Sequence, residues 1–304
     1  MSVIRTLWEG VYPAATTQFA EDLSVDFDAT QGVQSALVDD GVTGLIILGT
    51  CGENNSLEPD EKRDVLQGAV EAVAGRVPVV AGVSELTTAR AIQYAKDAEK
   101  LGADAIMLLP AMVYVPTPEE LQAHFRAVAE ATSLPIMLYN NPPAYRVDVD
   151  FATLEALRDV PNIVAIKESA PDPRRFTDVF NRFGDRYTVM AGLDDIALEG
   201  LFLGASGWVS GLTSAFPTES VRLVAAFNEG RYDEALAIYR WFMPLLHLDA
   251  DRDLVQSIKL AEEIMGRGSE RVRMPRMPLA GQRRKDVIAM VEKCAATQPS
   301  KIAA

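Results

Sequence analysis

The stretch Ile163-Val164-Ala165-Ile166-Lys167-Glu168 decides the fold, because it is a short apolar run that ends in two charged residues. Such a run is typical of a strand that is buried on both faces, as the strands of a parallel sheet are. Similar short runs occur at residues 10–16, 44–49, 77–83, 105–110, 135–140, 187–192 and 207–211.

From residue 44 onward these runs begin every 20 to 33 residues, about the length of one unit of strand, loop and helix. The intervening segments carry helix signals. The sequence Thr117-Pro118-Glu119-Glu120, for example, predicts a helix that begins at Pro118 behind a capping box. Eight such units predict the α/β fold class and, within it, a (β/α)8 TIM barrel.

The segment after the last strand contains more helix than a barrel needs. Helical patterns cover residues 221–228, 232–246, 253–265 and 284–294, and one helix suffices to complete the barrel. We therefore expect a C-terminal helical appendage. We expect residues 1–220 to form the barrel, and residues 221–304 to form the final barrel helix and a helical extension of the same domain.

Composition excludes several classes of function. A net charge of -14 without a basic cluster argues against a nucleic-acid partner. The chain has no run of about 18 apolar residues that would span a membrane, and its two cysteines lie far apart. We expect a cytoplasmic protein that binds a small molecule.

Reactive groups in such a barrel come from the C-terminal ends of the strands, where the loops converge on one mouth. This rule selects Thr50, Cys51 and Glu53 after the second strand, Tyr139 in the fifth and Lys167 in the sixth. It also selects Asp194 and Asp195 after the seventh strand. Gly192 at the end of the seventh strand and Val209 in the eighth are further expected substrate contacts.

Lys167 is the strongest candidate, because it follows apolar residues and should point into the barrel. Burial disfavours a charged ammonium group and favours the neutral amine. A neutral amine can attack a substrate carbonyl and form a Schiff base, which withdraws electrons from the adjacent carbon. The alternative is an outward-pointing lysine that pairs with Glu168.

The neighbouring candidates suit proton transfer and carboxylate binding. The phenol of Tyr139 can donate and accept a proton, although Tyr139 could also be a core aromatic residue. The backbone N–H groups of Thr50 and Cys51, in a glycine-flanked turn, could bind a substrate carboxylate. Asp194 and Asp195 are either substrate contacts or a helix N-cap.

Other chemistries lack the residues that they need. No histidine lies near Cys51 to activate it, so we assign this cysteine a packing or contact role. His124 and His247 fall in predicted helices and belong to no metal-ligand pattern. A glycine-rich phosphate loop is also absent from the sequence. We expect no metal and no cofactor.

The order of three motifs, GTCGE at 49–53, YNNP at 139–142 and IKES at 166–169, resembles the dihydrodipicolinate synthase and N-acetylneuraminate lyase superfamily of class I aldolases. The resemblance covers essentially the whole chain. It implies that Lys167 is the Schiff-base lysine, Tyr139 the proton-relay tyrosine and Thr50 the residue linked to it. It also implies carboxylate binding by the N–H groups of Thr50 and Cys51, and a homotetramer.

The departures from the synthase pattern concern the substrate. Ala144 stands where the synthases carry an arginine that receives a semialdehyde. The second relay tyrosine, which the family takes from a neighbouring subunit, is missing from its usual place in residues 110–116. Tyr114, which lies in this segment, is a candidate to replace the missing tyrosine. Cys51 replaces the commoner hydroxyl residue.

With LLHLD at 245–249, the motifs are most similar to the Δ1-pyrroline-4-hydroxy-2-carboxylate deaminases of hydroxyproline catabolism, hydrolases that act on C–N bonds. This resemblance implies release of ammonia and 2-oxoglutarate semialdehyde, with Asp194 and Asp195 near the distal hydroxyl or the amine. The alternatives are an aldolase or dehydratase of a 2-keto-3-deoxy sugar acid, and dihydrodipicolinate synthase. A barrel without turnover that senses 2-oxo acids is the non-enzymatic alternative.

Overall fold

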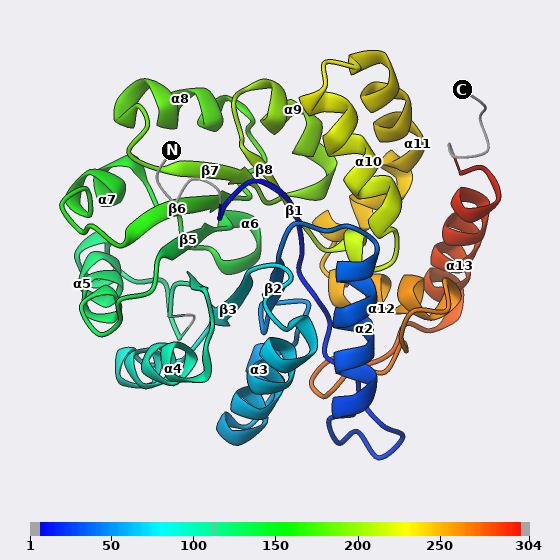
Figure 1. Ribbon diagram of the computed structural model, residues 1–304, viewed down its shortest axis with the longest axis horizontal. Helices are drawn as coiled ribbons and strands as arrows, with labels where there is room; N and C mark the ends of the chain where they lie inside the picture. The colour runs from blue at the N-terminus through cyan, green and yellow to red at the C-terminus, as the bar shows by residue number, and fades with distance from the viewer. Residues whose placement is uncertain (1–6, 112, 299–304) are drawn as a thin grey trace.

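The predicted strands form one parallel sheet that closes into a barrel (Figure 1). The computed structural model describes residues 7–111 and 113–298. Its strands are β1 (Gly10–Pro13), β2 (Leu45–Ile47), β3 (Val79–Val83), β4 (Ala105–Leu108), β5 (Ile136–Asn140), β6 (Ile163–Glu168), β7 (Thr188–Ala191) and β8 (Gly207–Ser210). Each lies within a predicted run, so the (β/α)8 barrel is confirmed.

The strands are hydrogen-bonded in the order β1-β8-β7-β6-β5-β4-β3-β2. The ring closes between β1 and β2, where Ala14 and Ile46 form a parallel bridge. In addition, the backbone N–H of Ala15 donates to the carbonyl of Ile46 at 2.8 Å. Closure gives every strand a neighbour on both sides, which leaves no strand edge to pair with another chain.

Helices surround the barrel in the alternating order that the spacing predicts (Figure 1). The capping box at Thr117 is confirmed: Thr117 Oγ1 accepts from the N–H of Glu120 at 3.3 Å, and Glu120 Oε2 accepts from the N–H of Thr117 at 2.8 Å. The outer helices are α2 (Phe27–Asp39), α3 (Pro59–Val73), α4 (Thr88–Leu101), α5 (Pro118–Ala129), α7 (Phe151–Ala156), α8 (Arg174–Phe183), α9 (Ala197–Phe202) and α10 (Pro217–Asn228).

Short helical turns occupy several loops at the C-terminal ends of the strands. These are α6 (Pro142–Tyr145), η1 (Asn54–Ser56), η2 (Asp194–Ile196) and η3 (Leu212–Ser214). They follow β5, β2, β7 and β8 respectively, which are the strands whose ends carry most of the predicted site residues. The loops therefore bring these segments to one mouth of the barrel.

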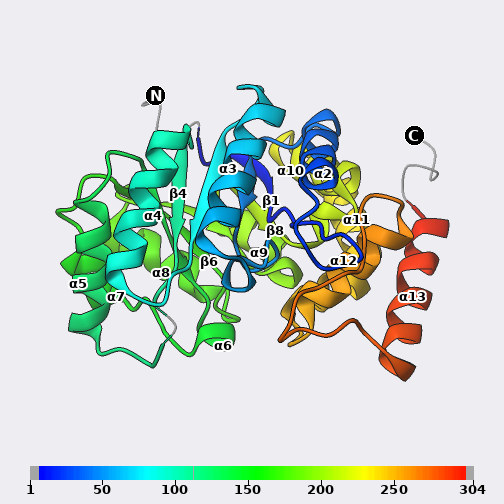
Figure 2. The ribbon, with the colours of Figure 1, turned by 90° about the horizontal axis from the view of Figure 1, so that it is seen from below.

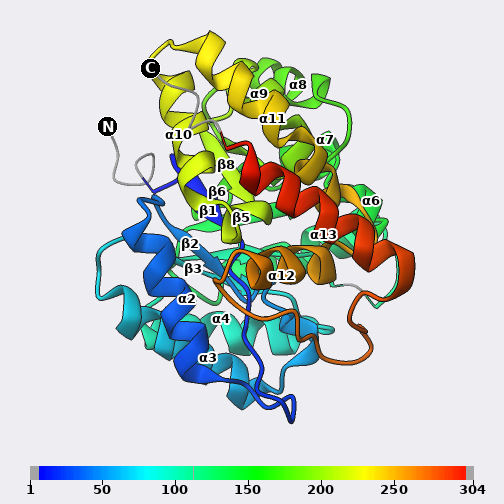
Figure 3. The same ribbon diagram turned by 90° about the vertical axis from the view of Figure 1, so that its right-hand side faces the viewer.

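The C-terminal extension consists of α11 (Tyr232–Ala250), α12 (Leu254–Ile264) and α13 (Gly281–Ala296). These helices lie at the opposite end of the molecule from α5 (Figure 2), and α13 packs along α12 on the outer side (Figure 3). Helix α11 contacts η2, and α12 contacts η3. The extension therefore reaches the same barrel end as the predicted site.

The core has two layers. An inner cluster fills the barrel, and a larger cluster lies between the sheet and the helices. The inner cluster includes Tyr12, Ile46, Val80, Met107, Met137, Tyr139, Met190 and Val209. Among the described helices, none has both the length and the apolar character needed to cross a membrane.

Candidate active site

Two of the predicted catalytic side chains lie next to each other inside the barrel. On β6, Ala165 faces the interior and Ile166 faces the helices, so strand alternation turns Lys167 inward. Tyr139 on β5 is the register partner of Lys167. The Nζ atom of Lys167 lies 4.1 Å from the centroid of the Tyr139 ring. The two strands therefore present an amine and a phenol together.

Glu168 points the other way and has partners of its own. Arg175 Nε donates to Glu168 Oε2 at 2.5 Å, and Asn140 Nδ2 donates to Glu168 Oε1 at 2.8 Å. Burial raises the pKa of Glu168, and the Arg175 guanidinium opposes this rise. The alternative of an outward-pointing Lys167 paired with Glu168 is therefore wrong.

The amine opens toward a cavity at the barrel mouth. An outer cavity of about 440 Å³ adjoins a smaller enclosed space that contains Lys167 and Tyr139. This volume suits a small-molecule ligand. The residues that line both parts are Thr50, Asn141, Ala144, Tyr145, Asp249 and Leu254.

The glycine-flanked turn at residues 49–53 has a strained backbone. Leu48 and Glu53 have φ angles of 56° and 53°, a region that is costly for residues other than glycine. A Cβ atom at Gly52 would lie 2.8 Å from the backbone nitrogen of Leu48, so the close approach of the two segments requires glycine there. Strain of this kind persists only where surrounding contacts hold it.

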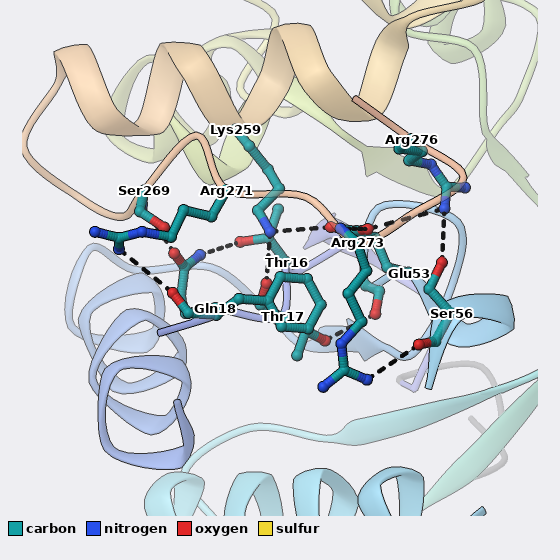
Figure 4. Close-up of polar contacts among 12 residues, drawn as sticks. Thr16, Thr17, Gln18, Glu53, Ser56, Lys259, Ser269, Arg271, Arg273 and Arg276 are labelled. Carbon is teal, nitrogen blue, oxygen red and sulfur yellow. Dashed lines mark hydrogen bonds and ion pairs between the residues drawn. The ribbon is translucent and has the colours of Figure 1, made fainter. Parts of the chain in front are cut away.

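A buried network anchors this turn to the C-terminal extension (Figure 4). Lys259 Nζ on α12 donates to Glu53 Oε1 at 3.0 Å and to the carbonyl of Thr17 at 2.8 Å. The backbone N–H of Arg273 donates to Glu53 Oε2 at 3.0 Å. Glu53 and Lys259 are fully buried, and burial lowers the pKa of Lys259 while Glu53 opposes this change. Glu53 therefore fixes the turn and is absent from the cavity lining.

Glu262 extends the network on the next turn of α12. Thr16 Oγ1 donates to Glu262 Oε2 at 2.8 Å, and Gln18 Nε2 donates to Thr16 Oγ1 at 2.8 Å. Burial raises the pKa of Glu262 to about 7. These contacts tie the segment that follows β1 to α12 behind the predicted site.

Thr50 and Cys51 line the space around the amine, as expected for residues that contact the substrate. Burial raises the pKa of the Cys51 thiol, which keeps it protonated and unsuited to act as a nucleophile. The binding of a substrate carboxylate by the two backbone N–H groups stays a prediction.

The structure adds a second phenol to the site. The Tyr145 hydroxyl, at the end of α6, is hydrogen-bonded to Thr50 Oγ1. The rings of Tyr145 and Tyr139 meet edge to face with their centroids 5.5 Å apart. Burial raises the pKa of Tyr145, and a hydrogen bond to Tyr139 adds to the rise. Thr50 is therefore connected to Tyr139 through Tyr145, not directly as the family resemblance implied.

Tyr114, the candidate to replace the missing relay tyrosine, does not reach the cavity of its own chain. Its side chain is 59% exposed, and its hydroxyl interacts with Glu120. Within the described residues, Tyr145 is the phenol that meets Thr50.

Asp194 and Asp195, the two aspartates predicted at the site, both bond to other side chains of the protein. Asp194 is fully buried and accepts hydrogen bonds from Trp208 Nε1 at 2.9 Å, Ser210 Oγ at 3.1 Å and the N–H of Leu212 at 3.0 Å. Burial raises its pKa well above the usual value. Its carboxylate thus joins η2 to β8 and η3, and a substrate contact for it stays a prediction.

Asp195 is paired with the exposed His247, whose Nδ1 lies 2.9 Å from Asp195 Oδ2. Neither Asp194 nor Asp195 caps a helix through its side chain in the way that the N-cap alternative required. Val209 packs in the inner core, outside the cavity lining.

Tyr145 and Asp249 are polar residues of the cavity that were missed as site residues. Tyr145 and Asp249 both lie at the ends of motifs that the sequence displays, YNNPPAY at 139–145 and LLHLD at 245–249. Both line the cavity beside Lys167. A polar side chain at the end of each motif was the sequence signal that could have identified them as site residues.

No cluster of three or more His, Cys, Asp or Glu side chains that could hold a metal ion occurs in residues 7–111 and 113–298. His124 is buried against Thr88, with 3.0 Å between its Nδ1 and the threonine Oγ1.

Comparison with known families identifies the relatives of this site. Residues 7–294 match the family model described as the dihydrodipicolinate synthetase family. The chain belongs to the dihydrodipicolinate synthetase family. Membership of this family makes it an enzyme of the Schiff-base lyase superfamily.

Curated and solved members of the dihydrodipicolinate synthetase family match nearly the full length of the chain. The chain is 34% identical to 4-hydroxy-tetrahydrodipicolinate synthase 1 of Halalkalibacterium halodurans over 277 residues, 91% of this chain and 94% of the relative. It superposes on the dihydrodipicolinate synthase of Aquifex aeolicus with a TM-score of 0.90 at 28% identity, covering 94% and 98% of the two chains.

A further member of the dihydrodipicolinate synthetase family was solved with a ligand. YagE, a prophage protein of Escherichia coli K12 in complex with pyruvate, matches with a TM-score of 0.89 at 27% identity. The match covers 96% of this chain and 100% of YagE.

Proposed function

We propose that this enzyme forms a Schiff base between Lys167 and the C2 carbon of a small 2-oxo acid or cyclic imine. The observation that carries the proposal is the position of Lys167, which lies inside the barrel against Tyr139 and lines a cavity. An amine in these surroundings can attack an electrophilic carbon, and the resulting imine acidifies the adjacent carbon. The covalent chemistry uses the lysine itself and requires no metal or organic cofactor.

Hydroxyl groups beside the amine carry the protons of this step. Formation and collapse of a carbinolamine require a donor and an acceptor next to the reacting nitrogen. Tyr139, Tyr145 and Thr50 form a connected set of hydroxyl groups within the cavity. Because burial raises the pKa of both phenols, each keeps its proton at neutral pH and can pass it along the set.

For the substrate we propose Δ1-pyrroline-4-hydroxy-2-carboxylate, which the enzyme deaminates in hydroxyproline catabolism. Ala144 lines the cavity at the position where, by the motif comparison, dihydrodipicolinate synthases carry an arginine. The arginine contact that would receive a semialdehyde is therefore missing. Attack of Lys167 on C2 breaks the bond between C2 and the ring nitrogen, which opens the ring and leaves that nitrogen as an amine on C5. Loss of the C3 proton and the C4 hydroxyl as water, followed by tautomerisation, gives an imine at C5. Hydrolysis at C5 releases ammonia, and hydrolysis at C2 releases 2-oxoglutarate semialdehyde and free Lys167.

A second candidate is the synthase reaction named in the curated relatives. Arg252 and Arg276 line the outer cavity and could receive a second anionic group. A 2-keto-3-deoxy sugar acid remains a third candidate, and it would need several partners for its hydroxyl groups. All three reactions share the lysine adduct and differ at the outer cavity.

Assays with each candidate substrate separately distinguish these reactions. Purified enzyme is given the hydroxypyrroline carboxylate, a 2-keto-3-deoxy sugar acid, or pyruvate with aspartate semialdehyde, and ammonia release and substrate loss are measured. The deaminase proposal predicts ammonia from the first substrate alone. The deaminase proposal would be contradicted if the enzyme consumed either of the other substrates without releasing ammonia and did not consume the hydroxypyrroline carboxylate.

Borohydride reduction in the presence of pyruvate tests the adduct itself. Wild-type enzyme should gain the mass of one reduced pyruvate adduct, and Lys167→Ala should gain none. An unchanged mass shift in Lys167→Ala would assign the adduct to another residue. An adduct without turnover of any candidate substrate would support the sensor alternative.

We also propose a cytoplasmic homotetramer. Val113, Tyr114 and Val115, on the loop before α5, are 60%, 59% and 61% exposed and offer an apolar surface to another subunit. Sedimentation of the purified enzyme tests this assembly, and a monomer at micromolar concentration would contradict it.

A further inference from the structure

Asp249 is an acid inside the cavity that the proposed steps leave without a role. It lies in the last turn of α11 and lines both the outer cavity and the enclosed space around Lys167. Gly211, which follows β8, makes room for it: a Cβ atom at Gly211 would lie 2.5 Å from Asp249 Oδ1 and 3.4 Å from Cys51 Sγ. The absence of a side chain at Gly211 therefore lets the carboxylate enter the site.

The surroundings of Asp249 combine basic side chains with several acids. Lys167 from β6 attracts its negative charge, while Asp195 from η2 repels it. Asp194 from η2, Cys51 after β2 and Tyr139 on β5 also interact electrostatically with it, and Arg252 and Arg276 line the outer cavity nearby. The carboxylate thus shares the enclosed space with the amine, and it comes from α11, a helix of the C-terminal extension.

Asp249 has fewer hydrogen-bond donors than Asp194, and it accepts a hydrogen bond from the backbone N–H of Asp194. Three donors from β8 and η3 occupy the Asp194 carboxylate, which is fully buried. Asp249 is partly exposed to the cavity. Burial raises the pKa of Asp249 to about 6, against the opposing charge of Lys167, so this group can both accept and donate a proton near neutral pH.

We infer that Asp249 is the acid–base residue that moves a proton from C3 to the C4 oxygen of a substrate bound to Lys167. This inference rests on the proposed function, because it assigns the elimination step of that reaction. Asp249 and Lys167 line the same enclosed space, so a substrate bound to the lysine would lie in the space that the Asp249 carboxylate also lines.

The step balances without another reactant. The Asp249 carboxylate takes the C3 proton, and the C–H electron pair forms a C2–C3 double bond that neutralises the iminium nitrogen. That enamine then expels the C4 hydroxyl, forming a C3–C4 double bond and restoring the iminium. Asp249 returns the proton to the departing oxygen, which leaves as water, and Asp249 is again a carboxylate.

Proton exchange into pyruvate isolates the first half of this step. Pyruvate bound to Lys167 should exchange its C3 hydrogens with D2O, and proton NMR of the methyl signal measures the rate. Asp249→Asn should slow exchange by about 10² or more, the usual contribution of an acid–base group. Borohydride trapping of pyruvate should stay within about threefold of wild type, since imine formation uses Tyr139.

Asp253→Asn is the matched control, because Asp253 is a nearby carboxylate at the N-cap of α12 and lies outside the cavity lining. Its exchange rate should equal that of wild type. Formate added to Asp249→Ala should restore part of the exchange, which a structural role of Asp249 would not allow. The wild-type exchange rate should also rise with pH through about 6, and this rise should be absent in Asp249→Asn.

Unimpaired exchange in Asp249→Asn would overturn the inference, as would wild-type enzyme that traps pyruvate without exchanging its C3 hydrogens. Loss of trapping in both Asp249→Asn and Asp249→Ala, without rescue by formate, would also overturn it. Because pyruvate is the probe, these results do not depend on ammonia release. Failure of the deaminase proposal and failure of the Asp249 assignment are therefore separate outcomes.

Discussion

The side chain of Lys167 passes directly over Gly192. A Cβ atom at Gly192 would lie 2.5 Å from Lys167 Cγ and 2.8 Å from Lys167 Cε. The backbone N–H of Gly192 donates to the carbonyl of Glu168 at 2.9 Å, so the strand end cannot move aside without losing that bond. Gly192, expected as a substrate contact, therefore has an observed role in leaving space for the lysine.

Gly192→Ala should slow formation of the lysine adduct by at least about tenfold. The added methyl group forces Lys167 out of its position, and overpacking of this kind costs about 1 to 3 kcal/mol. Timed borohydride trapping with pyruvate measures the rate. Gly32→Ala on α2 is the control, since a Cβ there meets no atom within 4 Å. Equal trapping rates for the two variants would contradict the steric role of Gly192.

Loss of the Tyr139 hydroxyl should slow imine formation by about 10² to 10⁴, the range of general acid–base catalysis. Tyr139→Phe keeps the ring that packs against Lys167, so the fold should remain intact. Tyr145→Phe should slow the same step, because it breaks the connection to Thr50. Stopped-flow or quenched trapping with pyruvate gives the rates.

Tyr94→Phe is the control for these two variants. The Tyr94 hydroxyl is buried on α4 and has no hydrogen-bond partner among the described residues, so its removal should leave the rate unchanged. Full activity of Tyr139→Phe would exclude it as the proton carrier.

The local pattern of the sequence predicted the strands and the inward lysine. Each strand is a short apolar run, and alternation along β6 follows directly from the order of its residues. That order is sufficient to place Lys167 inside the barrel and Glu168 outside. Local patterns determine these features, because the period of a strand fixes which residues share a face.

The contacts of Asp194 and Asp249 could not be predicted in this way. The donors of Asp194 that lie on β8 come from the next strand, and the entry of Asp249 into the cavity depends on how α11 packs against η2 and η3. Such positions follow from the tertiary packing of distant segments. The motif YNNPPAY contains Tyr145 but gave it no role, because its contact with Thr50 depends on how α6 positions it at the mouth.

Removal of Arg175 should destabilise the protein by about 3 to 5 kcal/mol, because it leaves the buried Glu168 carboxylate without its cation. Urea denaturation of Arg175→Met measures the free energy of unfolding. The double variant Arg175→Met with Glu168→Gln should regain part of the loss. Arg174→Met, whose ion pair is exposed, should change stability by less than about 1 kcal/mol. Equal effects of the two single variants would contradict the importance of the buried pair.

Glu262 should make the stability of the enzyme depend on pH near neutrality. Burial raises its pKa from 4.5 to about 7 in the folded protein. The folded state therefore holds this proton over a range in which the unfolded state has released it. The stabilising contribution is complete below pH 4.5 and is lost as pH rises through about 7, with a total near 3 kcal/mol.

Glu262→Gln cannot titrate and should remove this dependence. The free energy of unfolding of wild type minus that of Glu262→Gln, from urea denaturation between pH 4.5 and 8, should fall by about 3 kcal/mol as pH rises. Glu263→Gln, the exposed neighbour on α12, should give a curve parallel to wild type. A constant difference between wild type and Glu262→Gln would show that Glu262 is ionised throughout. The buried network behind the 49–53 turn would then hold that charge at every pH, through Thr16 and the nearby Lys259.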